Sequence, residues 1–237
     1  MHAINQATGY RQQTGSKGRL AIAWRCLWYA ASCLLLAGCD LLVQERFQDY
    51  TQEGIFLFGK GEFQGARECF QEALILLPND PNMLFNVAQC YDRQGDGKKA
   101  ESYYRLSLEK KPDLVDARFA LAMLIYRSGR RTEATQMIQD WMKEQPQMAE
   151  AFTLDGWRLR QESAYPQAQG RFQQALAIER NNPRALTELA SLYEVVQRPD
   201  IALVLYERAL DRDPRQPLLM QKVSQLRDRG VRPPLPD

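Results

Sequence analysis

The sequence predicts an all-α protein, a stack of five helix–turn–helix repeats of 34 residues closed by a C-terminal capping helix. Three columns of residues that recur every 34 positions predict this fold. The first column is always alanine, the second is always alanine or glycine, and the third holds large apolar residues. Their members are Ala66, Ala100, Ala134, Ala168 and Ala202; Gly54, Ala88, Ala122, Gly156 and Ala190; and Phe70, Tyr104, Ile138, Phe172 and Tyr206. Because one unit cannot bury its apolar face alone, the units must stack.

Residues 1–38 are expected to be an export signal. Basic residues without any acid precede an apolar run from Cys26 to Leu36, and this run is shorter than the roughly 20 residues of a membrane span. The run ends in the sequence Leu36-Ala-Gly-Cys39, which resembles the lipobox of bacterial lipoproteins. The resemblance implies that Cys39 is the acylated first residue of the mature protein, followed by a short membrane-proximal linker over residues 39–46. The alternatives are a retained signal anchor, or a soluble protein whose start is misassigned.

The repeats are expected over residues 47–216. In each unit, apolar residues spaced i, i+3, i+4 and i+7 form one face of the first helix. Small residues let the two helices approach closely, glycines such as Gly61, Gly95 and Gly129 supply the turn, and a proline ends the second helix. The expected units are 47–80, 81–114, 115–148, 149–182 and 183–216.

These columns resemble the tetratricopeptide repeat, which has small residues at positions 8 and 20 of the unit and proline at position 32. The resemblance implies a right-handed α–α superhelix, the solenoid of this family, whose first helices line a concave surface. Several residues depart from the family pattern: Trp141 stands where alanine is usual, Arg118 where a large apolar residue is usual, Glu53 and Asp155 where leucine is usual, and Arg180 where proline is usual. These departures put the local packing of the third and fourth units in doubt, but not the architecture.

Residues 217–229 are expected to form the capping helix. Leu219, Met220, Val223 and Leu226 make one apolar stripe, and the opposite face is polar, as the end of a solenoid requires. Residues 230–237 are expected to be a flexible proline-rich tail, either a frayed terminus or a polyproline ligand.

The resemblance places positions 2, 5, 9 and 12 of each unit on the concave surface. Aromatic side chains there exceed what the packing stripe needs, and an arginine beside them can hold a carboxylate. The predicted partner-binding groove consists of Phe85, Gln89, Phe119, Met123, Tyr126, Trp157 and Arg160. Phe58, Thr187 and Ser191 occupy other positions of the same stripe. We expect a peptide or helix of a partner protein to bind there, unless these rings complete the packing between repeats or lie under Leu41, Leu42 and Val43.

The composition argues against catalysis. The single histidine is His2, within the expected signal, so the mature protein lacks Ser-His-Asp, Cys-His and histidine–metal chemistry. No nucleotide, hydrolase or metalloprotease motif occurs. We expect no enzymatic activity, no cofactor, no metal and no small-molecule substrate. With 31 basic and 29 acidic residues, the chain also lacks the basic stripe of a nucleic-acid binder. Cys69 and Cys90 are read as buried free thiols in preference to a disulfide.

Together these features predict a membrane-anchored scaffold or adaptor in the cell envelope, facing the periplasm or the exterior. The expected partner is a membrane or envelope protein, since similar lipoproteins serve the assembly of pili, secretins and outer-membrane machinery. The alternative is a cytoplasmic or signal-anchored regulatory scaffold, and self-association stays open.

Overall fold

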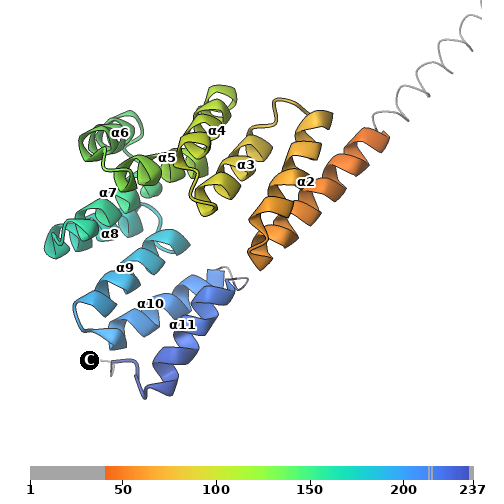
Figure 1. Ribbon diagram of the computed structural model, residues 1–237. Helices are drawn as coiled ribbons and strands as arrows, with labels where there is room; N and C mark the ends of the chain where they lie inside the picture. Colours follow the sequence, from red (N-terminus) through yellow and green to blue (C-terminus); the bar gives the residue numbers. More distant parts are fainter. Residues whose placement is uncertain (1–40, 213, 215, 235–237) are drawn as a thin grey trace, which may run out of the picture.

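The computed structural model describes residues 41–212, 214 and 216–234. All regular structure in this part of the chain is helical, which confirms the all-α class. Figure 1 shows the helices in a curved stack whose two ends bend toward each other. The predicted signal and the predicted lipidation site, Cys39, lie outside the described residues.

The helices follow one another through short turns. The first described helix covers residues 41–60. It is followed by α2 (Phe63–Leu76), α3 (Pro81–Arg93), α4 (Gly97–Lys110), α5 (Val115–Arg127), α6 (Arg131–Glu144), α7 (Ala149–Gln161), α8 (Tyr165–Ile178), α9 (Pro183–Val195), α10 (Pro199–Arg212) and α11 (Pro217–Asp228). The helices α3, α5, α7 and α9 begin 34 residues apart, so the sequence period is the period of the structure.

Residues 41–46 differ from expectation. The sequence predicts a linker over residues 39–46, but residues 41–46 are helical and continue without a break into the first helix of the stack. A helix rises only about 1.5 Å per residue, so this segment spans less distance than an extended linker. Among the described residues, no helix combines the length and the apolar character needed to cross a membrane.

Proline residues and short polar side chains set the helix starts. Pro81 begins α3 and Pro183 begins α9, where the missing N–H and fixed φ of proline suit the first helical position. The carboxylate of Asp80 accepts a hydrogen bond from the Met83 N–H at 2.8 Å. Such side chains satisfy amide groups that have no partner within the helix.

The turns inside the helix pairs share one backbone conformation. Their φ angles lie between +59° and +89°, the left-handed region that favours glycine. These turn residues are Gly61, Gly95, Gly129, Ser163 and Gln197, again 34 residues apart. The last two units therefore hold the same turn with residues that are strained in this conformation.

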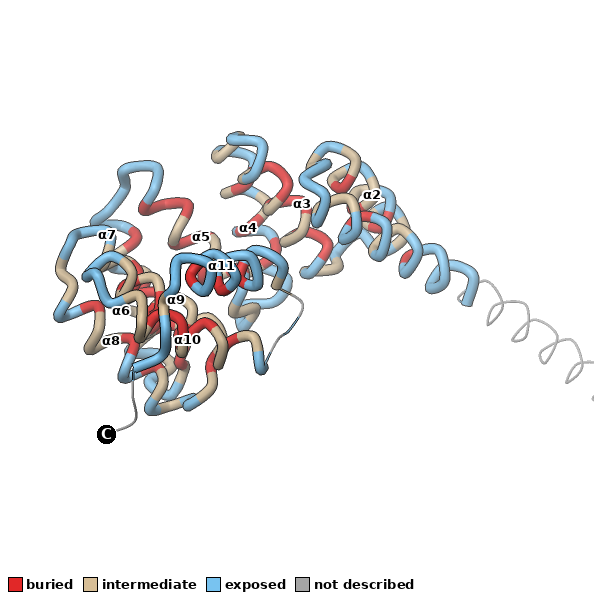
Figure 2. The backbone as a smooth tube through the Cα atoms, turned by 90° about the horizontal axis from the view of Figure 1, so that it is seen from below, coloured by how far each residue is buried: buried red, intermediate tan, exposed pale blue. Residues whose placement is uncertain are grey.

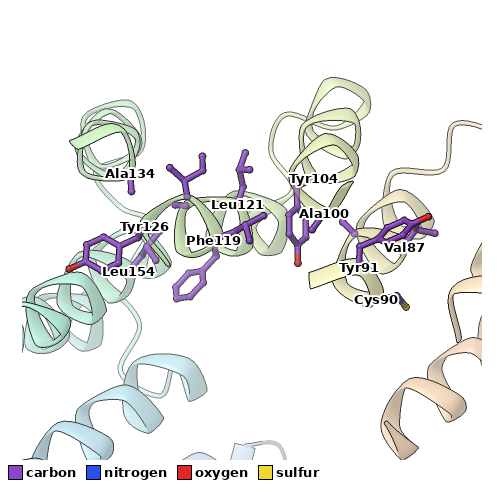
Figure 3. Packing of buried hydrophobic residues seen from close by; sticks show 14 of the residues in the cluster. Val87, Cys90, Tyr91, Ala100, Tyr104, Phe119, Leu121, Tyr126, Ala134 and Leu154 are labelled. Carbon is purple, nitrogen blue, oxygen red and sulfur yellow. The ribbon is translucent and has the colours of Figure 1, made fainter. Parts of the chain in front are cut away.

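The three columns form the centre of the core. The five column alanines are fully buried, and the large residues of the third column are at most 2% exposed. Figure 3 shows one example, in which Ala100 and Tyr104 of α4 point toward the neighbouring helices. Figure 2 shows buried positions along the inside of the stack and exposed positions on its outer turns.

Two residues of the second column are glycine because an aromatic ring leaves no room for a side chain. A Cβ atom at Gly54 would lie 2.5 Å from Cε1 of Phe70, and one at Gly156 would lie 2.6 Å from Cε1 of Phe172. Real Cβ contacts are essentially never this short. In these two units the glycine therefore fits the ring that packs against it, as close-packed interiors require.

Two of the residues that depart from the repeat pattern, Asp155 and Trp141, have internal partners. The carboxylate of Asp155 is buried and forms ion pairs of 2.7 Å with Arg158 and with Arg171. Trp141 is also buried, and its indole N–H donates to the side-chain oxygen of Gln145 at 3.0 Å. Both substitutions are therefore accommodated without a change in architecture.

The two cysteines of the described region are free. Cys69 is half-buried and Cys90 is buried. Burial raises the pKa of the Cys90 thiol to about 12 and also raises the pKa of the Cys69 thiol. Both thiols are therefore protonated at neutral pH and act as small apolar side chains.

Candidate protein-binding site

Three of the seven predicted groove residues belong to the core. Phe119, Tyr126 and Trp157 are each exposed by no more than 7%. The rings of Tyr126 and Trp157 pack edge to face with their centroids 5.3 Å apart, which joins the successive first helices α5 and α7. These rings fill space between repeats and present little surface to a ligand.

The chain itself bridges the middle of the concave face. The guanidinium group of Arg184 on α9 lies 4.4 Å from the ring centroid of Phe119 on α5. The same group donates a hydrogen bond to the carboxylate of Asp116 at 2.7 Å. Phe119 is therefore covered by an internal cation–π contact.

The other four predicted groove residues are half-buried. The ring of Phe85 packs against Tyr104, with centroids 5.8 Å apart. Gln89 and Met123 are also half-buried. Of the seven predicted residues, Arg160 is the one that lines the pocket described next.

The concave face is open where the two ends of the stack meet. A pocket of about 880 Å³ lies there, lined in part by the end of the helix over residues 41–60 and by the start of α11. Figure 1 shows these two helices at opposite ends of the stack. We call this pocket the end-to-end pocket. Its first wall consists of residues 58–61, Phe63 and Arg93. Its second wall consists of Arg160, Thr187, Glu188, Ser191, Tyr206, residues 216–219 and Lys222.

The cations of the second wall have internal partners. Arg160 pairs with the carboxylate of Glu188 at 2.8 Å and donates to the hydroxyl of Ser191 at 2.6 Å. Its Nε–H is buried and has no partner among the described residues. The ammonium group of Lys222 pairs with Glu194. Lys222 and Arg160 are therefore held in fixed positions at the pocket.

Burial affects the one carboxylate in the pocket wall. It raises the pKa of Glu188, and the nearby guanidinium groups of Arg160 and Arg184 oppose this shift without cancelling it. The ionised form of Glu188 is thus poorly solvated, and its pairing with Arg160 compensates only in part.

The first wall combines aromatic rings with unpaired cations. The rings of Phe58 and Phe63 pack edge to face with centroids 5.2 Å apart. Lys60 lies 4.0 Å from the ring centroid of Phe56, and Arg93 lies 5.9 Å from that of Phe58. Neither cation forms an ion pair within the described part of the chain. This wall can therefore offer both apolar contact and positive charge to a ligand.

Only some of the residues in this pocket belong to the concave stripe predicted from the sequence. Phe58, Thr187 and Ser191, which the resemblance assigns to the concave stripe, line the pocket. The period contains no sign that Lys60 and Lys222 face the same space, because their approach depends on curvature accumulated over the whole stack. No signal in the sequence shows that these two lysines line one pocket.

The side chains of the described residues are not arranged to hold a metal ion. Across residues 41–212, 214 and 216–234, no three His, Cys, Asp or Glu side chains come together as metal ligands do. The chemistry available in the end-to-end pocket is therefore that of cations, hydroxyl groups, one carboxylate and apolar side chains.

Comparisons with known proteins identify the fold. Residues 51–115 match the family model of the tetratricopeptide repeat. The structure is similar to TTC0263, a thermophilic TPR protein of Thermus thermophilus, with a TM-score of 0.60 and 24% identity over 76% of this chain and 98% of that chain. It is also similar to the Pseudomonas aeruginosa pilF structure, with a TM-score of 0.52 and 19% identity over 80% of this chain and 88% of that chain.

Among curated proteins, the outer dynein arm-docking complex subunit 4 of Danio rerio is 43% identical over 54 residues, which is 23% of this chain and 11% of that protein. In this and two other curated relatives, the part that matches the chain is between 9% and 22% of the relative's length. These similarities establish a tetratricopeptide-repeat fold, which is the fold that the sequence columns predicted.

Proposed function

We propose that this chain, a superhelix with the tetratricopeptide-repeat fold, is a scaffold that binds a segment of a partner protein in the end-to-end pocket. The observation that carries the proposal is the pocket of about 880 Å³ on the concave face. Leu218, in its wall, is 77% exposed, so an apolar surface is left uncovered in a hollow. Hollows of this kind suit an extended segment or a helix of a partner.

We further propose that the scaffold is lipid-anchored in the cell envelope through Cys39, facing the periplasm or the exterior. The lipobox-like sequence before Cys39 supports this anchor. Residue 41, which is already helical, follows only two positions later, so the anchor would hold the stack close to the bilayer. The partner is then a membrane or envelope protein, and assembly of an envelope, pilus or secretion complex is the more specific version. A cytoplasmic or signal-anchored scaffold is the alternative.

The anchor can be tested by metabolic labelling with radioactive palmitate in a bacterial host. We expect the wild-type chain and Cys33→Ser to incorporate the label, and Cys39→Ser to lose it. Label retained by Cys39→Ser would contradict acylation at this position.

The binding pocket can be tested by filling it. A Cβ atom at Gly59 meets no atom within 4 Å, and the same holds at Gly170 on α8, outside the pocket. A tryptophan at either position therefore adds bulk without a clash of its Cβ atom, but only Gly59→Trp fills the pocket.

The test compares tagged wild-type protein, Gly59→Trp and Gly170→Trp in affinity purification from the native membrane, with the captured proteins identified by mass spectrometry. We expect the wild-type chain and Gly170→Trp to retain a common partner that Gly59→Trp loses. Retention by all three proteins would show that the partner binds elsewhere on the stack.

A further inference from the structure

Building on the proposed function, we infer that the end-to-end pocket takes an acidic peptide segment that also carries an apolar side chain, and that this segment bridges the two ends of the stack. Three features of the pocket indicate this ligand: its charge balance, its apolar side chains and its two walls from opposite ends of the stack.

The charge balance favours an anionic segment. The cations of the second wall already have internal carboxylate partners, whereas Lys60 and Arg93 of the first wall form no ion pair within the described ranges. Two positive charges are thus left for a ligand. A concave surface concentrates their field, and carboxylates pair with ammonium and guanidinium groups through charge-assisted hydrogen bonds.

The apolar side chains of the pocket indicate that the ligand carries an apolar group as well as a negative charge. Leu218 projects from the start of α11 with 77% of its surface exposed. The edge-to-face rings of Phe58 and Phe63 lie on the opposite wall. An apolar side chain of the ligand, placed between these walls, would bury its own surface and theirs together, as the central residues of protein interfaces do. A free phosphate would leave this surface unused, and the stacking of nucleic-acid bases on the rings would leave the aliphatic Leu218 uncovered, so an acidic peptide is the better fit.

The two walls come from opposite ends of the stack. The first wall belongs to residues 58–93 and the second to residues 160–222. The strongest packing of the described helices is between neighbours in sequence, and α11 packs against α10. The distance between the walls is therefore set by the curvature of the whole stack, and a ligand that touches both walls acts as a clasp between its ends.

The probe for this inference is a short fluorescein-labelled peptide in which Glu alternates with Phe and Leu. Fluorescence anisotropy measures its binding to the full chain in detergent micelles. Two comparison peptides carry Lys in place of Glu, or Ser in place of Phe and Leu. We expect the acidic apolar peptide to bind at least ~10-fold more tightly than either, and to weaken as salt is added.

Charge-reversal variants test the first wall. We expect Lys60→Glu combined with Arg93→Glu to weaken binding by ~10-fold or more, because repulsion replaces attraction. Lys111→Glu combined with Arg229→Glu is the matched control, since both residues are exposed, lie outside the pocket and change the net charge equally. The control should bind within ~2-fold of the wild-type affinity.

A truncation tests the second wall. We expect Leu218→Ala to weaken binding by ~3-fold to 10-fold through lost apolar contact. Met220→Ala is its control, because Met220 is also an exposed apolar residue of α11, 55% exposed, but lies outside this pocket. Unchanged affinity in Leu218→Ala would overturn the two-sided clasp.

Other outcomes overturn the charge assignment. Equal affinity for the Lys peptide, tighter binding of a single-stranded oligonucleotide, or an equal loss in the control pair would each do so. Failure of the acidic peptide to bind, with partner capture still abolished by Gly59→Trp, would refute the acidic ligand and leave the proposed function intact. Capture that survives Gly59→Trp would instead refute the proposed function itself.

Discussion

The close approach of the Phe172 ring to Gly156 predicts that Gly156→Ala destabilises the protein. A Cβ atom at this position would lie 2.6, 2.7 and 3.0 Å from three atoms of the Phe172 ring. The ring cannot move aside easily because Phe172 is completely buried. One methyl group therefore has to displace the packing between α7 and α8.

The magnitude follows from two opposing terms. Overpacking a tight core costs about 1–3 kcal/mol. Replacing glycine by alanine inside a helix gains about 1 kcal/mol. Because three ring atoms are contacted, we place the overpacking in the upper part of its range and expect a net loss of about 1–2 kcal/mol.

Urea unfolding followed by far-UV circular dichroism measures this loss as a shift of the midpoint. Gly170→Ala is the control, because its Cβ atom would meet nothing within 4 Å; it should stabilise the protein by up to about 1 kcal/mol. The double variant Gly156→Ala with Phe172→Ile copies the pair Ala122 and Ile138 of another unit. Its loss of stability should be smaller than the sum of the losses of the two single variants by at least about 1 kcal/mol. The reasoning is refuted if Gly156→Ala is as stable as the wild-type protein.

Three further predictions concern the buried polar and thiol groups. Asp155→Asn should lower the free energy of unfolding by about 2–4 kcal/mol in urea titrations, because its two arginine partners lose a buried carboxylate. Its control, Asp140→Asn, breaks an exposed ion pair of 3.7 Å and should change the free energy of unfolding by less than about 1 kcal/mol. Ser107→Ala should cost about 1 kcal/mol in the same assay, since the fully buried hydroxyl donates to the Pro81 carbonyl at 2.7 Å; an unchanged midpoint would count against that bond. Cys90, whose pKa is raised to about 12 by burial, should resist iodoacetamide equally at about pH 7 and pH 9 and react only in urea, as peptide mass spectrometry can show; faster labelling of the native protein at the higher pH would contradict its burial.

The fold was predictable because the residues that determine the packing of each helix pair recur in every unit. Alanine and glycine recur where helices touch, and a large apolar residue recurs opposite them. These are properties of neighbouring residues, so a sequence period of 34 reports them directly. Even the turns at Ser163 and Gln197 keep the left-handed conformation that glycine adopts elsewhere, although residue type alone would not have predicted it.

The site was less predictable because it depends on distances that accumulate over many repeats. The rings of Phe119, Tyr126 and Trp157 looked surplus to the packing pattern, yet tight curvature brings α5, α7 and α9 close enough to bury them. The same curvature brings Lys60 and Lys222 to one pocket. Small rotations between successive units decide such contacts, and no short sequence pattern encodes them.

The central claim is that the partner binds between the two ends of the stack. Site-specific photo-crosslinking in the native host tests it most directly, with p-benzoylphenylalanine in place of Leu218 in the pocket or in place of Ile75, which is 70% exposed and outside it. The account predicts a discrete adduct from position 218 that is lost when Gly59→Trp is added, and none from position 75. Adducts of equal yield at both positions, or adducts at position 75 alone, would contradict it.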